Sequence, residues 1–463
     1  MFKNYLKTAL RSLQKNKVHS FINIAGLSVG MAVAMLIGLW IWDELSFDKY
    51  HQNYNSIAQV MENDTHNGTI FTQSAIPLPL EAELRKSYGS DFKHIVVSSW
   101  NDPHTLAVGD KQVSYPGSFI GAEAPEMFTI TMINGTRGGL QGPSSMLISQ
   151  SVAKALFGND NPMDKLIKLD NNASFKVSGV YEDLPASTTL HDVAFMAPFD
   201  FYEASENGHR SLTDWSDNSL FLYVQVADNV DVARLSEKIK DIKLNKAGPG
   251  EAKLKPTILL QPMNRWHLYS KFKNGINTGG AIEYVWLFGI IGIFVLLLAC
   301  INFMNLSTAR SEKRSKEVGI RKAVGSLRGQ LITQFYCESL IFAVVAFAFS
   351  LALVVLILPS FNEVANKQMA ILWSNPLFWV MSAGFTLFTG LIAGSYPALY
   401  LSSFNPVKVL KGAFKAGRFA AIPRKVLVVV QFTVSVVRMI EHGFLGFSGL
   451  QRISFYLRKS IQS

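Results

Sequence analysis

Charged residues are scarce in this chain. Asp, Glu, Lys and Arg make up 17% of its 463 residues, where about 25% is usual. Cysteine is rarer still: the chain has only Cys300 and Cys337, so no disulfide framework is expected. The 49% of hydrophobic residues excludes a disordered chain. A net charge of +10 leaves two classes, a basic nucleic-acid binder or a membrane protein.

Sequence signatures of catalysis are also missing. The chain has no H-E-x-x-H zinc motif, no G-x-S-x-G nucleophile elbow and no P-loop. We therefore predict no catalytic residue, no metal site and no ATPase in it. Segment 43–283 holds histidines that lack metal-ligand spacing, and we interpret them as scattered surface residues. They are His51, His66, His94, His104, His191, His209 and His267.

The apolar residues are gathered in long runs. An α-helix needs about 20 residues to cross a hydrocarbon core about 30 Å thick. Four runs reach that length and predict transmembrane helices over residues 21–42, 284–306, 335–358 and 377–401. A fifth run, at the start of 426–463, has only 12 residues before Arg438 and is predicted to be an incomplete helix followed by a tail.

The basic residues set the predicted orientation. Segments 1–20, 307–334 and 402–425 carry an excess of Lys and Arg, whereas 43–283 holds 21 basic and 29 acidic residues. By the positive-inside rule the three basic segments are cytoplasmic, and 43–283 is extracytoplasmic. The net charge therefore reflects membrane topology, and no nucleic-acid partner is expected.

Segment 43–283 is long enough to form a folded domain. Residues 175–181 alternate as a strand does, and 149–157 has a helical pattern. Turn signals occur at Asn67-Gly68 and Pro116-Gly117. The predicted fold class is an α-helical membrane protein with four transmembrane helices and a large α+β extracytoplasmic domain between helices 1 and 2.

The basic segment 307–334 contains an apolar pattern. If it is helical from about Ser315, one stripe of that helix collects its apolar side chains. These are Ile320, Val324, Leu327 and Leu331. Two interpretations follow: a basic amphipathic helix on anionic lipid headgroups, or a helix that docks into a groove of a cytoplasmic partner.

Several segments of the chain carry motifs that point to one known family. Residues 317–325 read Glu-Val-Gly-Ile-Arg-Lys-Ala-Val-Gly, and residues 395–410 begin Ser-Tyr-Pro-Ala-Leu-Tyr. These two segments resemble the link between the second and third helices, and the exit from the fourth helix, of the MacB/FtsX-type permeases of ATP-binding-cassette transport systems. In the large domain, 147–158 and 177–185 resemble the MacB-like periplasmic core domain. The amino-terminal amphipathic stretch and residues 21–30 fit as well.

The resemblance implies a non-catalytic, multi-pass subunit of the inner (cytoplasmic) membrane, with a cytoplasmic N-terminus. Such a permease relays ATP-driven motion of a separate cytoplasmic ATPase to the extracytoplasmic domain. No cofactor is expected in this chain; ATP and Mg are expected on the ATPase. A second permease copy or half is a further expected partner. Two functions stay open. One is export, for example of antimicrobial peptides or lipoproteins, and the other is FtsX-like control of an extracytoplasmic enzyme.

The resemblance also implies which residues couple the chain to the ATPase, and it favours docking over lipid binding. Glycines would allow close backbone approach, and charges would fix the register on an acidic partner surface. The implied coupling residues are Glu317, Gly319, Ile320, Arg321, Lys322, Val324 and Gly325.

The chain departs from the family pattern in two places. Family members often have Gly after Asn-Pro-Ile, whereas this chain has Asn161-Pro-Met-Asp164, which we expect to alter a turn. Close relatives are often twice as long, and 424–437 resembles the start of a second half. We expect the first half of a longer permease, with a tail from Arg438 produced by a change of reading frame. A short native end and an inactive half-permease are the alternatives.

Polar and small residues inside the predicted helices mark further sites. We expect Glu338, about one turn inside the third helix, to face Asn302, Asn305 or a basic residue of the coupling segment. In the first helix, small residues spaced four apart form a ridge against which another helix can pack closely. They are Gly26, Gly30, Ala34 and Gly38.

Overall fold

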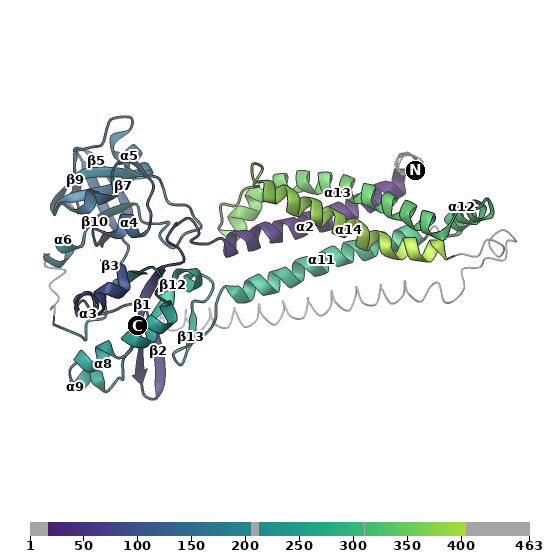
Figure 1. Cartoon of the computed structure of the whole chain (residues 1–463). Coiled ribbons are helices and arrows are strands. Elements are labelled where there is room, and N and C mark those ends of the chain that lie inside the picture. The colour runs from purple at the N-terminus through teal and green to yellow at the C-terminus, as the bar shows by residue number, and fades with distance from the viewer. Residues whose placement is uncertain (1–16, 205–212, 310, 404–463) are drawn as a thin grey trace, which may run out of the picture. The chain divides into compact units, whose positions relative to one another are not determined.

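The chain divides into two compact units (Figure 1). Among the described residues, the helical unit comprises those up to Leu39 and those from Phe288 onward, and the large domain comprises those within Trp40–Leu287. The computed structural model describes residues 17–204, 213–309 and 311–403. Predictions made for residues 1–16, for 404–425 and for the incomplete helix and tail at 426–463 lie outside the described residues.

The described residues contain four helices that are long and apolar enough to cross a bilayer. They are α2 (Lys17–Leu45), α11 (Ile282–Ala309), α13 (Arg328–Ala365) and α14 (Pro376–Ser402). Each contains one of the four apolar runs, since a backbone in hydrocarbon has to satisfy its hydrogen bonds within the segment. The prediction of four transmembrane helices with a large domain between the first and second is confirmed.

One apolar cluster joins all four membrane helices. The rings of Phe303 on α11 and Phe342 on α13 meet edge to face at its centre, 5.6 Å apart. Its buried members are Leu27, Met31, Leu296, Cys300, Phe303, Met304, Phe342, Ala343, Ala346 and Ala393. The helices therefore contact one another through side chains, and a displacement of one helix is resisted by the other three.

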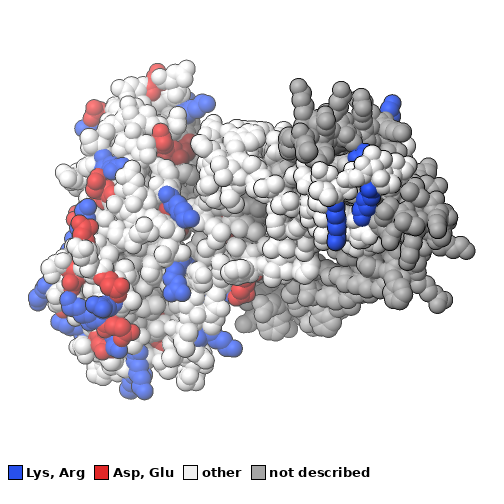
Figure 2. Space-filling model, turned by 45° about the vertical axis from the view of Figure 1, so that its right-hand side comes forward, with Lys and Arg blue, Asp and Glu red and all other residues white. Residues whose placement is uncertain are grey.

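The charged side chains follow the division into two units. Figure 2 shows Lys, Arg, Asp and Glu spread over the large domain, whereas the described surface of the helices is nearly free of charge except for basic residues at one end. An uncharged surface of this kind is what a helix bundle presents to lipid.

The large domain is an α+β domain with a mixed sheet. Its strands are β1 (Ile57–His66), β2 (Thr69–Gln73), β3 (Phe92–Ser98), β4 (Asp102–Val108), β5 (Lys111–Ile120), β6 (Met132–Gly135), β7 (Ser145–Ser149), β8 (Leu166–Leu169), β9 (Ala173–Tyr181), β10 (Phe195–Pro198), β11 (Phe221–Val226) and β12 (Thr257–Pro262), with a separate hairpin of β13 (Lys271–Lys273) and β14 (Ile276–Gly279). Its helices are α3 (Pro79–Tyr88), α4 (Ala124–Met127), α5 (Gln150–Phe157), α6 (Phe199–Ala204), α7 (Val232–Ile239), α8 (Ile242–Lys246), α9 (Pro249–Ala252) and α10 (Met263–Trp266).

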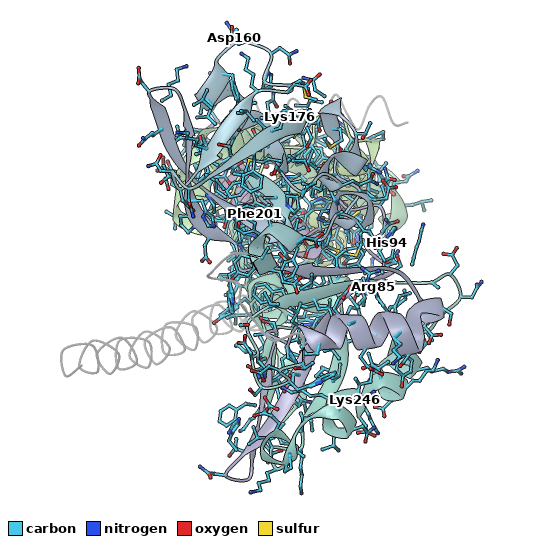
Figure 3. All side chains as sticks on the ribbon, turned by 90° about the vertical axis from the view of Figure 1, so that its left-hand side faces the viewer. Arg85, His94, Asp160, Lys176, Phe201 and Lys246 are labelled. Atoms are coloured by element: carbon cyan, nitrogen blue, oxygen red, sulfur yellow. The ribbon has the colours of Figure 1, made fainter. Side chains whose placement is uncertain are left out.

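Two lobes share this sheet. The first follows a β-α-β-β-α-β order, β1-α3-β3-β11-α7-β12, and its strands lie side by side as β3-β11-β1-β12, all antiparallel. This is the ferredoxin-like arrangement. Residues 99–220 are inserted between β3 and β11, and the described residues among them form the second lobe. Figure 3 shows Lys246 at the end of the domain formed by the first lobe, and Asp160 and Lys176 at the opposite end, in the second.

Turn chemistry was predicted correctly at one place and wrongly at another. Asn67 and Gly68 have φ of 50° and 79° and join β1 to β2, as the Asn-Gly signal predicts. Pro116 and Gly117 instead lie inside β5. A Cβ on Gly117 would overlap the buried ring of Phe195, so this glycine serves close packing of β10 against β5. Asp164 has φ of 61°, the left-handed region that favours glycine.

A buried charge cluster fastens α8 to β1. Glu62 and Lys243 are fully buried, and Lys243 Nζ donates to Glu62 Oε1 at 2.5 Å and to Asn218 Oδ1 at 2.9 Å. Asp64, on the same face of β1, is also buried and accepts from Gln73. Burial, and next the hydrogen bond with Asp64, raise the pKa of Glu62 to about 8, against the opposing effect of Lys243.

We predict that Gly117→Ala lowers the free energy of unfolding of the large domain by about 1–3 kcal/mol, because the Phe195 ring has to move within a packed core. The measurement is urea unfolding of the purified full chain, followed by far-ultraviolet circular dichroism. Gly89→Ala is the matched control, since a Cβ there meets nothing within 4 Å among the described residues. An equal midpoint for Gly117→Ala and the wild type would contradict the prediction.

We predict that the contribution of Glu62 to domain stability falls as the pH rises from about 5 to 8 and then levels off. The folded protein keeps a proton on Glu62 that the unfolded chain releases near its ordinary value of 4.5, so one such group contributes a slope of at most about 1.4 kcal/mol per pH unit. Glu62→Gln removes the titrating group and should flatten this slope in urea unfolding. Glu237→Gln, at an exposed carboxylate, should keep it; equal slopes in all three proteins would refute the assignment.

Candidate coupling site

The coupling segment is a helix, a turn and the start of the next helix. The helix is α12 (Ser311–Ala323), and α13 begins at Arg328. Between them Gly325 has φ of 103°, which an L side chain adopts only with strain. The side chain of Gln330 then accepts from the backbone N–H of Leu327, which begins the new helix. Gly325 is thus required by the backbone conformation of the turn.

The turn corrects one sequence prediction. Ile320, Val324, Leu327 and Leu331 do not share one helical stripe, because Gly325 redirects the chain between α12 and α13. Ile320, Val324 and Leu327 are 55%, 84% and 68% exposed, whereas Leu331 is 3% exposed. The three exposed residues form what we call the coupling face.

A second apolar group holds α12 to the bundle. Val318 is 3% exposed and belongs to a small buried cluster. The other buried members are Leu331 and Phe335 of α13 and Ala398 and Leu401 of α14. Gly319, next to Val318, is buried as well. The apolar side of α12 that packs is therefore the Val318 side, and the coupling face lies outside this cluster.

The charged residues of the segment contact this chain's own helices. Arg321 donates to Glu317 at 2.6 Å within α12 and also to Gln334 on α13. Lys322 Nζ donates to the backbone carbonyl of Ser402, the last residue of α14, at 2.7 Å. These contacts fix α12 to both neighbouring helices.

The predicted ridge of small residues on α2 lies partly against α11. A Cβ added to Gly30 would overlap that of Ala299, and one added to Gly26 would lie 3.3 Å from the Asn302 amide nitrogen. Ala34 packs at the edge of the four-helix cluster. A Cβ on Gly38 meets no described atom within 4 Å. The close approach of α2 to α11 is therefore concentrated at the Gly26–Gly30 end of the ridge.

The intramembrane polar residues lie on different helices near the end that carries α12. Asn302 is exposed on α11, beside Gly26, and Asn305 is half-buried one turn further along. Glu338 is half-buried on α13. The expected pairing of Glu338 with these amides or with the coupling segment stays a prediction.

A set of contacts that the sequence did not reveal surrounds the exit of α2 into the large domain. Glu44, in the last turn of α2, pairs with His267 at 2.5 Å, and the His267 ring stacks on Phe47 at 3.8 Å. The next residue, Leu268, accepts at its carbonyl from the N–H of Ile282, where α11 begins. His267 and Leu268 therefore bridge the ends of the two membrane helices that carry the domain.

Next to this bridge, Asp48 is fully buried and accepts from the Thr189 N–H at 2.6 Å and from the Thr188 hydroxyl at 2.9 Å. The same hydroxyl lies 2.8 Å from His51 Nε2, while His51 Nδ1 donates to the carbonyl of Phe128. Burial lowers the pKa of His51, with smaller opposing effects of the Phe128 carbonyl and Asp48. His51 is 1% exposed, so its interpretation as a surface residue is wrong.

Other histidines of the domain lie beside carboxylates. The pairs are His94 with Glu123, His104 with Asp170 and His191 with Asp192. Figure 3 shows His94 and Arg85 on the same side of the domain, where both contact Glu123. Among the described residues no group of three or more His, Cys, Asp or Glu is placed to hold a metal ion.

Comparisons with known proteins match the two units separately. Residues 20–242 match the model of the MacB-like periplasmic core domain, and residues 289–406 match that of the FtsX-like permease C-terminal domain. The chain is 23% identical over 442 residues to the macrolide export ATP-binding/permease protein MacB of Bdellovibrio bacteriovorus, which covers 88% of this chain and 61% of that protein.

Two further proteins are similar over part of the chain. The uncharacterized ABC transporter permease YknZ of Bacillus subtilis is 24% identical over 275 residues, 59% of this chain and 62% of that protein. The crystal structure of the periplasmic region of MacB from Actinobacillus actinomycetemcomitans aligns with a TM-score of 0.33 and 16% identity over 44% of this chain and 89% of that one.

The chain spans about three fifths of the length of the two curated relatives. Its two matched domains follow one another in the order that the structure shows, a large α+β domain after the first membrane helix and then the remaining helices. The chain belongs to the MacB/FtsX-type permeases of ATP-binding-cassette transporters.

Proposed function

We propose that this chain is the membrane subunit of an ATP-driven export or mechanotransmission system. A separate cytoplasmic ATPase, which would carry the ATP and Mg, docks on the coupling face. Its motion is relayed through the membrane helices to the domain at 43–283. In this proposal the chain itself performs no catalysis, and it lies in the inner membrane beside a second permease copy or half.

The observation that carries the proposal is the coupling face. Ile320, Val324 and Leu327 expose apolar side chains on a short helix and turn that other contacts hold in place. Burying an apolar side chain stabilises a complex by about 1.5–3 kcal/mol. Three such residues on a rigid turn suit an apolar groove of a partner.

The charges support the proposed orientation. The end of the bundle that carries α12 holds Arg321, Lys322 and Arg328, whereas the domain at 43–283 has an excess of acid. Lys and Arg are retained on the cytoplasmic side of membrane proteins. The coupling face then lies on the side where an ATPase has access to ATP.

We predict that Val324→Asp abolishes ATPase capture, because a carboxylate cannot enter an apolar groove without losing its hydration. The full-length chain, affinity-tagged and purified from its native membrane in mild detergent, is tested for a co-eluting protein that has a P-loop sequence and hydrolyses ATP.

Ile276→Asp is the matched control, since Ile276 is 69% exposed on the large domain and should leave capture unchanged. Absence of such an ATPase from the wild-type eluate would contradict the proposed function. Full capture by Val324→Asp would place the docking surface elsewhere.

A further inference from the structure

Lys322 lies at the end of α14 and satisfies one of its last carbonyls. The last four carbonyls of an α-helix have no partner within the helix, and they give this end a partial negative charge. Lys322 Nζ, which comes from α12, donates to the Ser402 carbonyl at 2.7 Å. Ser402 is the last residue of α14 and is fully buried. An ammonium at this point is favoured both as a donor and as a positive charge.

Two other contacts of α12 reach the same pair of helices. Arg321, next to Lys322, donates to Gln334 on α13. Val318, one turn earlier, belongs to the same buried cluster as Leu331 of α13 and Leu401 of α14. An apolar contact, a charge-assisted hydrogen bond from Arg321 and an ammonium at a helix end thus hold α12 to α13 and α14.

The helices that receive these contacts are themselves closely packed. A Cβ added to Gly394 of α14 would overlap the Ser339 side chain of α13, and one added to Gly390 would lie 2.7 Å from Leu340. Small residues at such positions let two helix backbones approach closely in a membrane. There is little room for α13 and α14 to slide past each other without side-chain clashes.

We propose that Lys322 is a positioning residue that locks the coupling segment to α14, so that α12, α13 and α14 move as one body. The coupling face then transmits a displacement to two membrane helices at once, where a hinged α12 would only swing on its turn. The use of this lock rests on the proposed function. The lock itself is a property of the chain alone.

The test is backbone amide hydrogen exchange of the full-length chain in lipid nanodiscs, without any partner. Lys322→Met keeps the length and helix propensity of the side chain but removes the donor and the charge. We expect the amides of 320–323 and those of 399–403 to exchange about tenfold faster, because both helix ends lose the same contact.

Two variants separate the lock from a general effect of charge. Lys322→Arg keeps a cation and a donor and should exchange as the wild type does. Arg328→Met removes a positive charge from the same segment at a residue that is exposed and has no ion pair within the described part of the chain, and it should also match the wild type.

The proposal is overturned if Lys322→Met exchanges at wild-type rates, or if only 320–323 is affected while 399–403 is not. It is also overturned if Lys322→Arg is as fast as Lys322→Met. ATPase capture by the wild type is scored separately. If the wild type captures no ATPase, the proposed function is refuted. The exchange rates alone then decide whether Lys322 fixes α12 to α14.

Discussion

The close approach of α13 and α14 sets the geometry of the helical unit. Gly390 and Gly394 leave space that Leu340 and Ser339 fill, so the two backbones come nearer than larger side chains allow. A buried cluster forms where α13 begins and α14 ends; its members are Val318, Leu331, Phe335, Ala398 and Leu401. Without this approach α12 would lack the surface on which it rests, and Lys322 would not reach the carbonyl of Ser402.

The two pairs of membrane helices have different attachments. α13 and α14 hold the coupling segment, whereas α2 and α11 lead into and out of the large domain. The proposed relay would pass from the first pair to the second through the shared apolar cluster, where Phe303 meets Phe342. On the domain side, the contact of Glu44 with His267, and that of Leu268 with Ile282, joins the ends of α2 and α11. These contacts are the ones that the proposed relay would use.

The large domain consists of one complete strand motif with an insertion, and a buried pair of charged residues holds one of its helices. Its first lobe has a complete ferredoxin-like strand order, and 99–220 is an insertion that extends the same sheet. The buried Glu62–Lys243 pair joins α8 to the central strand of that lobe. Because both groups are fully buried and hydrogen-bonded to each other, the pair fixes the position of α8 even where its net contribution to stability is small.

The amino-acid sequence by itself determined the four membrane helices, the place of the large domain and its mixed α+β character. The helices follow from local composition, because a long apolar run in lipid is stable as an α-helix. The α+β character follows from the strand and helix periodicities of 43–283. Tertiary structure decided what periodicity could not. Gly325 breaks the stripe that Ile320 and Leu331 were predicted to share, since a single backbone angle redirects everything that follows. The contacts of Lys322 with Ser402 and of Lys243 with Glu62 join residues 80 and 181 positions apart, and only the folded chain brings such groups together.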